Sequence, residues 1–219
     1  MSWAAALAAG LAAAVMWGVT TPVLVRLPEP TPGGGKLPYR ELATPGFTVA
    51  VSLSTLAAAL VVVANAPPHT WLAWLGLVGP CVLAAVIDAR TTYLPKLLCH
   101  IGWLFAGAGA AWASVATQSL APFGWAAIGA LAAGGFFLLL WRLNPGMGFG
   151  DVRLMAAIGA VCGVQDIRLV MWAVMAGTLV GVAWGIVHRS VRGPGPFAYG
   201  PSLLAGPFIA IMVQPLAAF

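Results

Sequence analysis

Long apolar runs fill most of the chain, and short clusters of proline, glycine and charged residues separate them. A run of about 20 apolar residues is long enough to cross the hydrocarbon core of a bilayer as a helix. We therefore predict an all-α, polytopic membrane protein with eight transmembrane helices. The predicted helices cover residues 3–25, 47–64, 71–87, 97–117, 122–141, 152–164, 168–187 and 201–217. The sixth is short for a span, so it is either tilted or partly submerged, or it extends into Gln165 and Asp166.

The composition agrees with this pattern. Hydrophobic residues make up 61% of the 219 residues and charged residues only 7%, whereas soluble domains are about 25% charged. This excludes a soluble enzyme, a disordered tail and a nucleic-acid-binding protein, because ten cations scattered between apolar runs do not form a basic patch. We interpret residues 1–219 as a single transmembrane domain whose surroundings are the lipid bilayer.

The positive charges predict an orientation. Nine of the ten cations lie in odd-numbered connections between the predicted helices, and only Arg168 lies in an even-numbered one. The nine are Arg26, Lys36, Arg40, Arg90, Lys96, Arg142, Arg153, Arg189 and Arg192. With eight helices all odd-numbered connections share one face, and the positive-inside rule makes this face cytoplasmic. Both termini are then predicted to lie outside.

Two segments near the N-terminus have simple interpretations. The first connection, residues 26–46, is predicted to be a flexible cytoplasmic loop, because the proline and glycines at 31–35 do not support a regular element. The apolar run before it is not a cleavable signal peptide, because it is as long as a span and is preceded by no basic residue.

Small and thiol side chains are assigned structural roles. The glycines at four-residue spacing on the seventh predicted helix, Gly177, Gly181 and Gly185, predict close helix packing without chemistry. The three cysteines, Cys81, Cys99 and Cys162, lie singly within apolar runs and are expected to be buried thiols. Since no C-x-x-C pair and no cluster of metal ligands occurs, we expect no metal and no cofactor.

Only two of the five acidic residues call for a functional explanation. Glu29 and Glu41 lie in the hydrated first loop, and Asp166 fits a helix cap or a local pair with Arg168. Asp88 and Asp151 instead flank apolar helices at the predicted cytoplasmic face, where an acid is costly. Taken singly, Asp151 could be a helix cap and Asp88 could lie in headgroup water. Taken together, they return to the same depth and can meet if the third and sixth helices are neighbours.

A pair of carboxyl groups can hydrolyse a peptide bond. The ionised one takes a proton from water while the protonated one donates to the scissile carbonyl, and their proximity separates their pKa values. Gly148 and Gly150 beside Asp151 are expected to permit unusual backbone conformations and to leave room for a substrate backbone. The three histidines are scattered and no G-x-S-x-G motif occurs, so no other nucleophile competes.

Three segments carry a family resemblance. Residues 148–154, GFGDVRL, contain the G-x-G-D motif of membrane-embedded aspartic proteases, and the following Val and Arg resemble type IV prepilin peptidases. Residues 87–95, IDARTTYLP, and 198–206, AYGPSLLAG, are similar to that family's first-aspartate and final segments, the latter usually Pro-Phe-Gly-Pro. The segments occur in family order, and the resemblance covers roughly residues 71–217, the expected peptidase core.

The resemblance implies an aspartic endopeptidase that removes the short basic leader of type IV prepilins or pseudopilins at the cytoplasmic membrane boundary. Asp88 and Asp151 would be catalytic, and Gly148 and Gly150 would shape the backbone of the active site. Pro95, Lys96 and Arg153 are candidates for a substrate loop. The protein would be a multi-pass protein of a bacterial or archaeal cytoplasmic membrane.

The chain departs from the family pattern in two places. Lys96 follows Pro95 where many members carry Asn or Asp. The first connection lacks the two C-x-x-C pairs that many bacterial members carry there and that are associated with zinc and with methylation of the new pilin N-terminus. We therefore expect no N-methyltransferase activity.

Two other functions compete with this one. A presenilin-like protease would carry Tyr before the first Asp and a Pro-Ala-Leu motif, whereas here Ile87 precedes Asp88 and that motif is absent. A small transporter or a pilus or secretion assembly subunit could use the same acids for protons or partners, but no convincing internal repeat supports a transporter. The sequence leaves open which pilin-like precursor is the substrate and what the oligomeric state is.

Overall fold

The computed structural model describes residues 3–28, 37–144, 146–193, 195 and 197–213. Within these residues the regular structure is entirely helical. The long helices are α1 (Trp3–Arg26), α2 (Pro45–Asn65), α5 (Lys96–Ala116), α6 (Ala121–Leu143), α7 (Phe149–Gln165), α8 (Ile167–Arg192) and α9 (Gly200–Val213). One further continuous segment joins η2 (Pro68–Thr70), α3 (Trp71–Gly76), the π-helical turn η3 (Leu77–Cys81) and α4 (Val82–Thr91).

Six described helical segments are long and apolar enough to cross a membrane, which confirms an all-α, multi-pass membrane protein. They are Trp3–Arg26, Pro45–Asn65, Pro68–Thr91, Lys96–Ala116, Ala121–Leu143 and Ile167–Val191. The other two predicted helices correspond to α7, with 17 residues, and α9, with 14. The short sixth helix does extend to Gln165, and Asp166 then caps α8 by accepting a hydrogen bond from the Arg168 N–H at 2.8 Å.

Several helix ends differ from the prediction. The third helix was predicted to end at residue 87 but continues to Thr91, so Asp88 and Arg90 lie inside it. Arg142 and Arg153 likewise lie within helices rather than in loops. The physical reason is that a long cationic side chain near either end of a helix can extend toward water without ending the helix. The last predicted helix, 201–217, is described only to Val213, and residues 31–35 of the first connection lie outside the described residues.

The third membrane-capable segment, Pro68–Thr91, contains a feature that the apolar pattern did not predict. Pro80 has no backbone N–H to donate, and it lies inside the π-helical turn η3. The helix is regular again from Val82 and ends where Thr92 adopts a left-handed conformation with φ of 54°. The chain can then reverse toward α5 within four residues.

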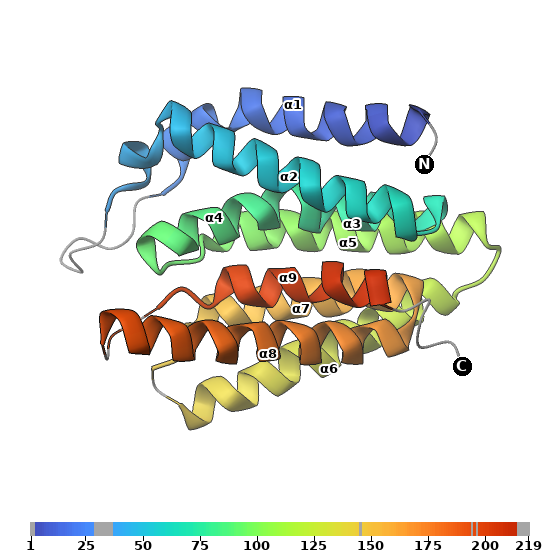
Figure 1. The fold of residues 1–219 in the computed structure, drawn as a ribbon. Helices are drawn as coiled ribbons and strands as arrows, with labels where there is room; N and C mark the ends of the chain where they lie inside the picture. The colour runs from blue at the N-terminus through green and yellow to red at the C-terminus, as the bar shows by residue number, and fades with distance from the viewer. Residues whose placement is uncertain (1–2, 29–36, 145, 194, 196, 214–219) are drawn as a thin grey trace.

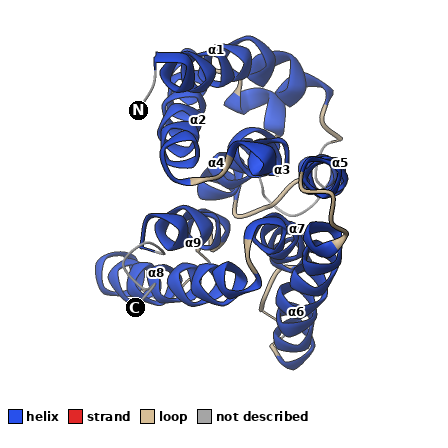
Figure 2. Cartoon of the chain, turned by 90° about the vertical axis from the view of Figure 1, so that its right-hand side faces the viewer, coloured by secondary structure: helices blue, strands red, loops and turns tan. Residues whose placement is uncertain are grey.

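The helices form a bundle with their axes roughly along one direction (Figure 1). Viewed along that direction, α1 and α2 lie at one side, α3 to α5 in the middle, and α7 between α5 and α6 (Figure 2). Helix α9 packs against α8 and also contacts α4 and α7. The N-terminal end of α1 and the C-terminal end of α9 lie at the same end of the bundle (Figure 1).

Small residues allow the closest packing between helices. A Cβ atom on Gly159 of α7 would lie 2.1 Å from the Gly129 carbonyl oxygen of α6, so only glycine allows these backbones to approach. The three cysteines are fully buried free thiols, as expected from their apolar surroundings.

Candidate active site

Asp88 is a buried acid near the C-terminal end of α4, with only 5% of its surface exposed. Its Oδ2 atom accepts a hydrogen bond of 2.9 Å from the backbone N–H of Gly200, the first residue of α9. A Cβ atom at position 200 would lie 2.8 Å from that same oxygen, so glycine is needed for the approach. The contact fixes the Asp88 carboxyl group and places it where α4 and α9 meet.

Asp151 lies in the first turn of α7 and is 8% exposed. The helix begins after Gly148, whose carbonyl oxygen accepts a hydrogen bond of 3.1 Å from the Asp151 N–H. Asp151 is therefore inside the helix and is not its N-cap residue. A carboxylate in a first helical turn is favoured by the positive end of the helix dipole.

Neither glycine beside Asp151 has an unusual backbone conformation, and only Gly150 is required for its small size. Gly148 has an ordinary extended backbone with φ of −73°, and the only positive-φ glycine among the described residues is Gly193. The expectation of unusual conformations is thus wrong for these two positions. Gly150 is instead required for space, because its Cβ atom would lie 2.7 Å from the Cβ of Leu94. This contact brings the chain after Asp88 directly against the turn that carries Asp151.

Both aspartates line one cavity of about 920 Å³. Its walls come from the end of α4 and the loop after it, from the start of α7, from α6 and α8, and from the segment before α9. Two carboxyl groups buried in the same cavity disfavour simultaneous ionisation, because like charges repel more strongly away from water. One proton shared between them allows one group to act as a base and the other as an acid.

Of the three candidate substrate-loop residues, only Arg153 lines this cavity. Its guanidinium lies 4.5 Å from the centre of the Phe149 ring, whose edge-to-face contact with Trp141 has a centroid distance of 5.0 Å. Pro95 is buried at the N-cap of α5, and Lys96 is exposed in the first turn of that helix. The loop residue that lines the cavity near them is Leu94.

Helix α8 contributes a cavity wall that the sequence analysis did not assign to the site. Gly177 packs against Leu203 of α9, as the glycine spacing predicted. Gly181, however, faces an aromatic ring: its Cβ atom would lie 2.1 Å from Cε2 of Tyr199. Tyr199 and Thr178, one turn before Gly181, both line the cavity. The glycine spacing and the final segment 198–206 together carried the signal for this wall.

The next glycine along α8 accommodates a second ring. A Cβ atom on Gly185 would lie 3.2 Å from Cζ of Phe197, which also lines the cavity. Phe197 and Tyr199 contact each other edge-to-face, with centroids 5.8 Å apart. The segment before α9 thus places two aromatic rings on the smooth face of α8 and leads directly into Gly200, the partner of Asp88.

The first connection also reaches the site region. A short 3₁₀ helix, η1 (Tyr39–Leu42), buries Tyr39 almost completely. The Tyr39 ring lies 6.3 Å from the ring of Tyr93, measured between centroids, and Tyr93 lines the cavity. The described end of this connection therefore supports the loop that follows Asp88.

Comparison with known proteins gives a consistent result. The model of the type IV leader peptidase family matches residues 75–186, a stretch that contains both aspartates. The prepilin leader peptidase/N-methyltransferase of Burkholderia pseudomallei is 32% identical over 189 residues, covering 80% of this chain and 54% of that protein. The protein of the same name from Aeromonas hydrophila is 30% identical over 196 residues, covering 83% of this chain and 59% of that protein.

The match is shorter in other relatives. The prepilin leader peptidase/N-methyltransferase of Neisseria gonorrhoeae is 30% identical over 155 residues, or 64% of this chain and 49% of that protein. The chain spans about half the length of the curated relatives it matches. No solved structure matches the chain.

Proposed function

Because the chain belongs to the type IV leader peptidase family, we propose that it is a membrane aspartic endopeptidase that removes the short basic leader of type IV prepilins or pseudopilins. The observation that carries this proposal is the burial of Asp88 and Asp151 in one cavity. Two elements far apart in the sequence each place one buried acid there, and a separate structural role for each acid does not explain this convergence.

In the proposed reaction the ionised aspartate removes a proton from a water molecule, which attacks the scissile carbonyl carbon. The protonated aspartate donates its proton to the carbonyl oxygen as the tetrahedral intermediate forms. Collapse of the intermediate breaks the C–N bond, and the departing amine takes a proton from the dyad. The Gly200 N–H supports this chemistry by holding the Asp88 carboxyl group in one orientation.

We also propose that all eight helical segments cross or enter the membrane, with both termini outside and the cavity at the cytoplasmic end. The clustering of nine of the ten cations in the odd-numbered connections or in the helix turns beside them supports this orientation. At about 1.5 Å per residue, α7 is shorter than the roughly 30 Å hydrocarbon core. The acid in its first turn would then lie close to the membrane boundary.

We propose that the protein has no N-methyltransferase activity. The connection between α1 and α2 contains no cysteine, so it offers no counterpart to the C-x-x-C pairs that the family resemblance associates with zinc and methylation. Mass spectrometry of a co-expressed prepilin would test this together with cleavage. We expect a mature N-terminus that is shortened and unmethylated, and a methylated N-terminus formed by this chain alone would contradict the proposal.

The central test replaces each acid by its amide. Asp88→Asn and Asp151→Asn should each lower cleavage of a co-expressed prepilin by about 10²–10⁴-fold, the range that acid–base groups contribute. Asp166→Asn is the matched control, since Asp166 caps α8 away from the cavity and should leave cleavage nearly unchanged. Cleavage retained by either dyad variant, with membrane insertion confirmed by immunoblot, would contradict the assignment.

A further inference from the structure

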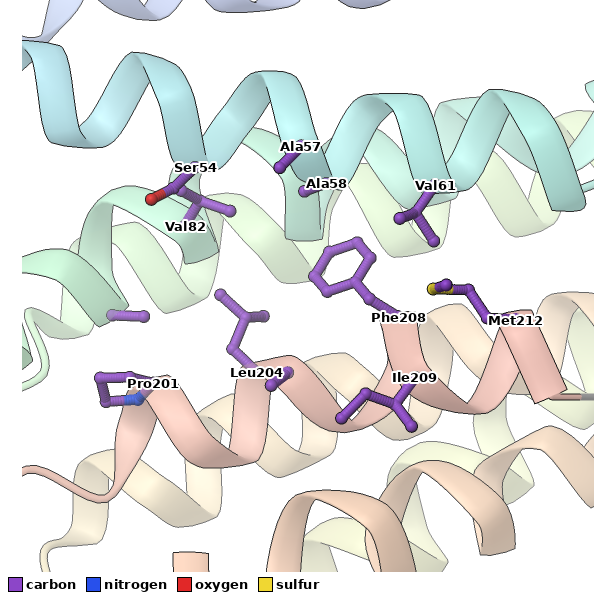
Figure 3. Close-up of a pocket in the computed structure, with 12 residues that line it drawn as sticks. Ser54, Ala57, Ala58, Val61, Val82, Pro201, Leu204, Phe208, Ile209 and Met212 are labelled. Atoms are coloured by element: carbon purple, nitrogen blue, oxygen red, sulfur yellow. The ribbon is translucent and has the colours of Figure 1, made fainter. Parts of the chain in front are cut away.

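A second cavity lies between α2, α4 and α9, and we call it the lateral groove (Figure 3). Its volume is about 340 Å³, and it is an open groove rather than an enclosed cavity. On α2 it is lined by Ser54, Ala57, Ala58 and Val61, and the facing wall is formed mainly by α9 (Figure 3). The dyad chemistry uses none of these residues.

The residues that line the groove suit an apolar occupant whose backbone packs closely against α2. Ser54 is the one polar side chain among the residues that line the groove. The α2 wall is built from small side chains, which allow a second helix to approach closely in a membrane. An ion or a polar metabolite would find almost nothing to bind here.

The groove approaches the active site along two helices. On α4 it is lined by Val82 and Ala85, six and three residues before Asp88, so all three lie along one side of that helix. On α9 it begins at Pro201, the residue after Gly200, whose N–H binds Asp88. From Pro201 it follows α9 as far as Met212, a distance of about 16 Å at the helical rise of about 1.5 Å per residue.

The outer edge of the groove is exposed. Met212 is 54% exposed, and Ser54 and Ala57 are also exposed on the opposite wall. These residues lie in two apolar helices, α2 and α9. With both helices placed in the membrane as proposed above, the groove opens toward lipid rather than water. An occupant can therefore enter sideways from the bilayer.

We propose that the lateral groove docks the membrane-embedded apolar segment of the protein substrate, the part that continues from the bond held at Asp88 and Asp151. This inference rests on the proposed function. A polypeptide explains why the groove leads to the catalytic acid and why its α2 wall consists of small residues, and a lipid chain explains neither. Lipid fills the groove only when substrate is absent.

Disulfide cross-linking tests the position of the substrate. Ser54→Cys is combined with Asp151→Asn, so that the precursor is not consumed, and co-expressed with a prepilin that carries single cysteines along its apolar segment. The native thiols are fully buried and should not react. The matched control is Ala132→Cys, an exposed position on α6 that lines neither cavity.

We expect adducts with Ser54→Cys at prepilin positions three to four residues apart, as one face of a helix would give, and few adducts with Ala132→Cys. No adduct at Ser54→Cys, or equal adducts at both positions, in membranes where the wild-type chain cleaves the precursor, would overturn the groove proposal. Failure of the wild-type chain to cleave the precursor would instead contradict the proposed function.

A substitution that fills the lateral groove gives an independent test of the proposal. Ala57→Trp places a large side chain in the groove, and Ala132→Trp places the same side chain on the exposed face of α6, away from both cavities. We expect Ala57→Trp to slow prepilin cleavage about tenfold or more, since a displacement of about 1 Å can cost 100-fold, while Ala132→Trp cleaves at the wild-type rate. Equal rates for the two variants, at equal amounts of inserted protein, would overturn the proposal.

Discussion

Glycine has different roles in two regions of this bundle, the seam between α6 and α7 and the walls of the dyad cavity. In the seam, Gly129 and Gly159 meet backbone to backbone, and a Cβ atom on either would fall within about 2 Å of the other's carbonyl oxygen. At the cavity, Gly150, Gly181 and Gly200 face side chains: Leu94, the Tyr199 ring and the Asp88 carboxyl group. The difference teaches that closeness alone does not identify a functional glycine. What matters is whether the neighbour is fixed backbone or a side chain that lines the cavity.

The largest effect is expected in the seam. Gly159→Ala puts a Cβ atom 2.1 Å from a backbone oxygen that cannot move independently, so α6 and α7 must separate. We expect a loss of about 1–3 kcal/mol or more, the range for overpacked cores, seen as a lower Tm in detergent and less inserted protein. If this variant has normal stability, the distinction between the seam glycines and the cavity glycines is wrong.

A smaller effect on stability but a large one on activity is expected for Gly200→Ala. The added methyl group lies 2.8 Å from Oδ2 of Asp88, so the carboxyl group must turn away from the position that it holds in the dyad. Because a misplacement of about 1 Å can cost about 100-fold in rate, we expect cleavage to fall between tenfold and that value. Measurement of kcat separately from Tm will show whether the loss lies in chemistry. A fall in Tm with an unchanged kcat would show that Gly200 acts through packing, as the seam glycines do.

Gly181→Ala should act more weakly, through Tyr199. The ring must leave the face of α8, which moves its hydroxyl group and one cavity wall. A contribution equal to one hydrogen bond, about 0.5–1.5 kcal/mol, corresponds to a two- to tenfold loss in kcat/KM. Tyr199→Phe, which keeps the ring and removes only the hydroxyl, tells whether the ring or the hydroxyl matters. If kcat/KM of the folded Gly181→Ala protein is unchanged, α8 is a packing surface only.

The smallest effect is expected for Gly185→Ala, because its Cβ atom would meet only the edge of the Phe197 ring, at 3.2 Å, and a ring edge can shift by a few tenths of an ångström. Activity should stay within about twofold, well under the 1.4 kcal/mol that a tenfold change requires. Gly10→Ala is the baseline control: nothing lies within 4 Å of the added methyl group in α1, and the better helix former should raise stability slightly. A loss of activity in Gly10→Ala would show that the assay responds to changes far from the cavity.

Apolar run length predicted the helices well, because a bilayer demands the same length of almost every span. It failed at helix ends such as Asp88 to Thr91, where charged residues continue the helix. It also gave no sign of the π-helical turn around Pro80. These details depend on backbone hydrogen bonding within one turn, and the apolar pattern does not record it.

The two acids were predictable for a different reason. Charge is so scarce in this chain that Asp88 and Asp151 stood out, and the structure places both in one cavity. The partners of these acids were not predictable in the same way. The amide of Gly200, the side chain of Leu94 and the ring of Tyr199 have no unusual chemistry, and only the packing of α9 and the loop after α4 brings them to the dyad.

The hydrogen bond from Gly200 to Asp88 has a consequence for the order in which the protein is made. A growing chain that already contains α4 and α7 has both acids, but it does not yet contain the Gly200 amide. That amide arrives with α9, which follows both acid-bearing helices in the sequence. Synthesis from the N-terminus therefore completes the surroundings of Asp88 only when nearly the whole described chain has been made. Under the proposed function, the two acids reach their working arrangement late in assembly.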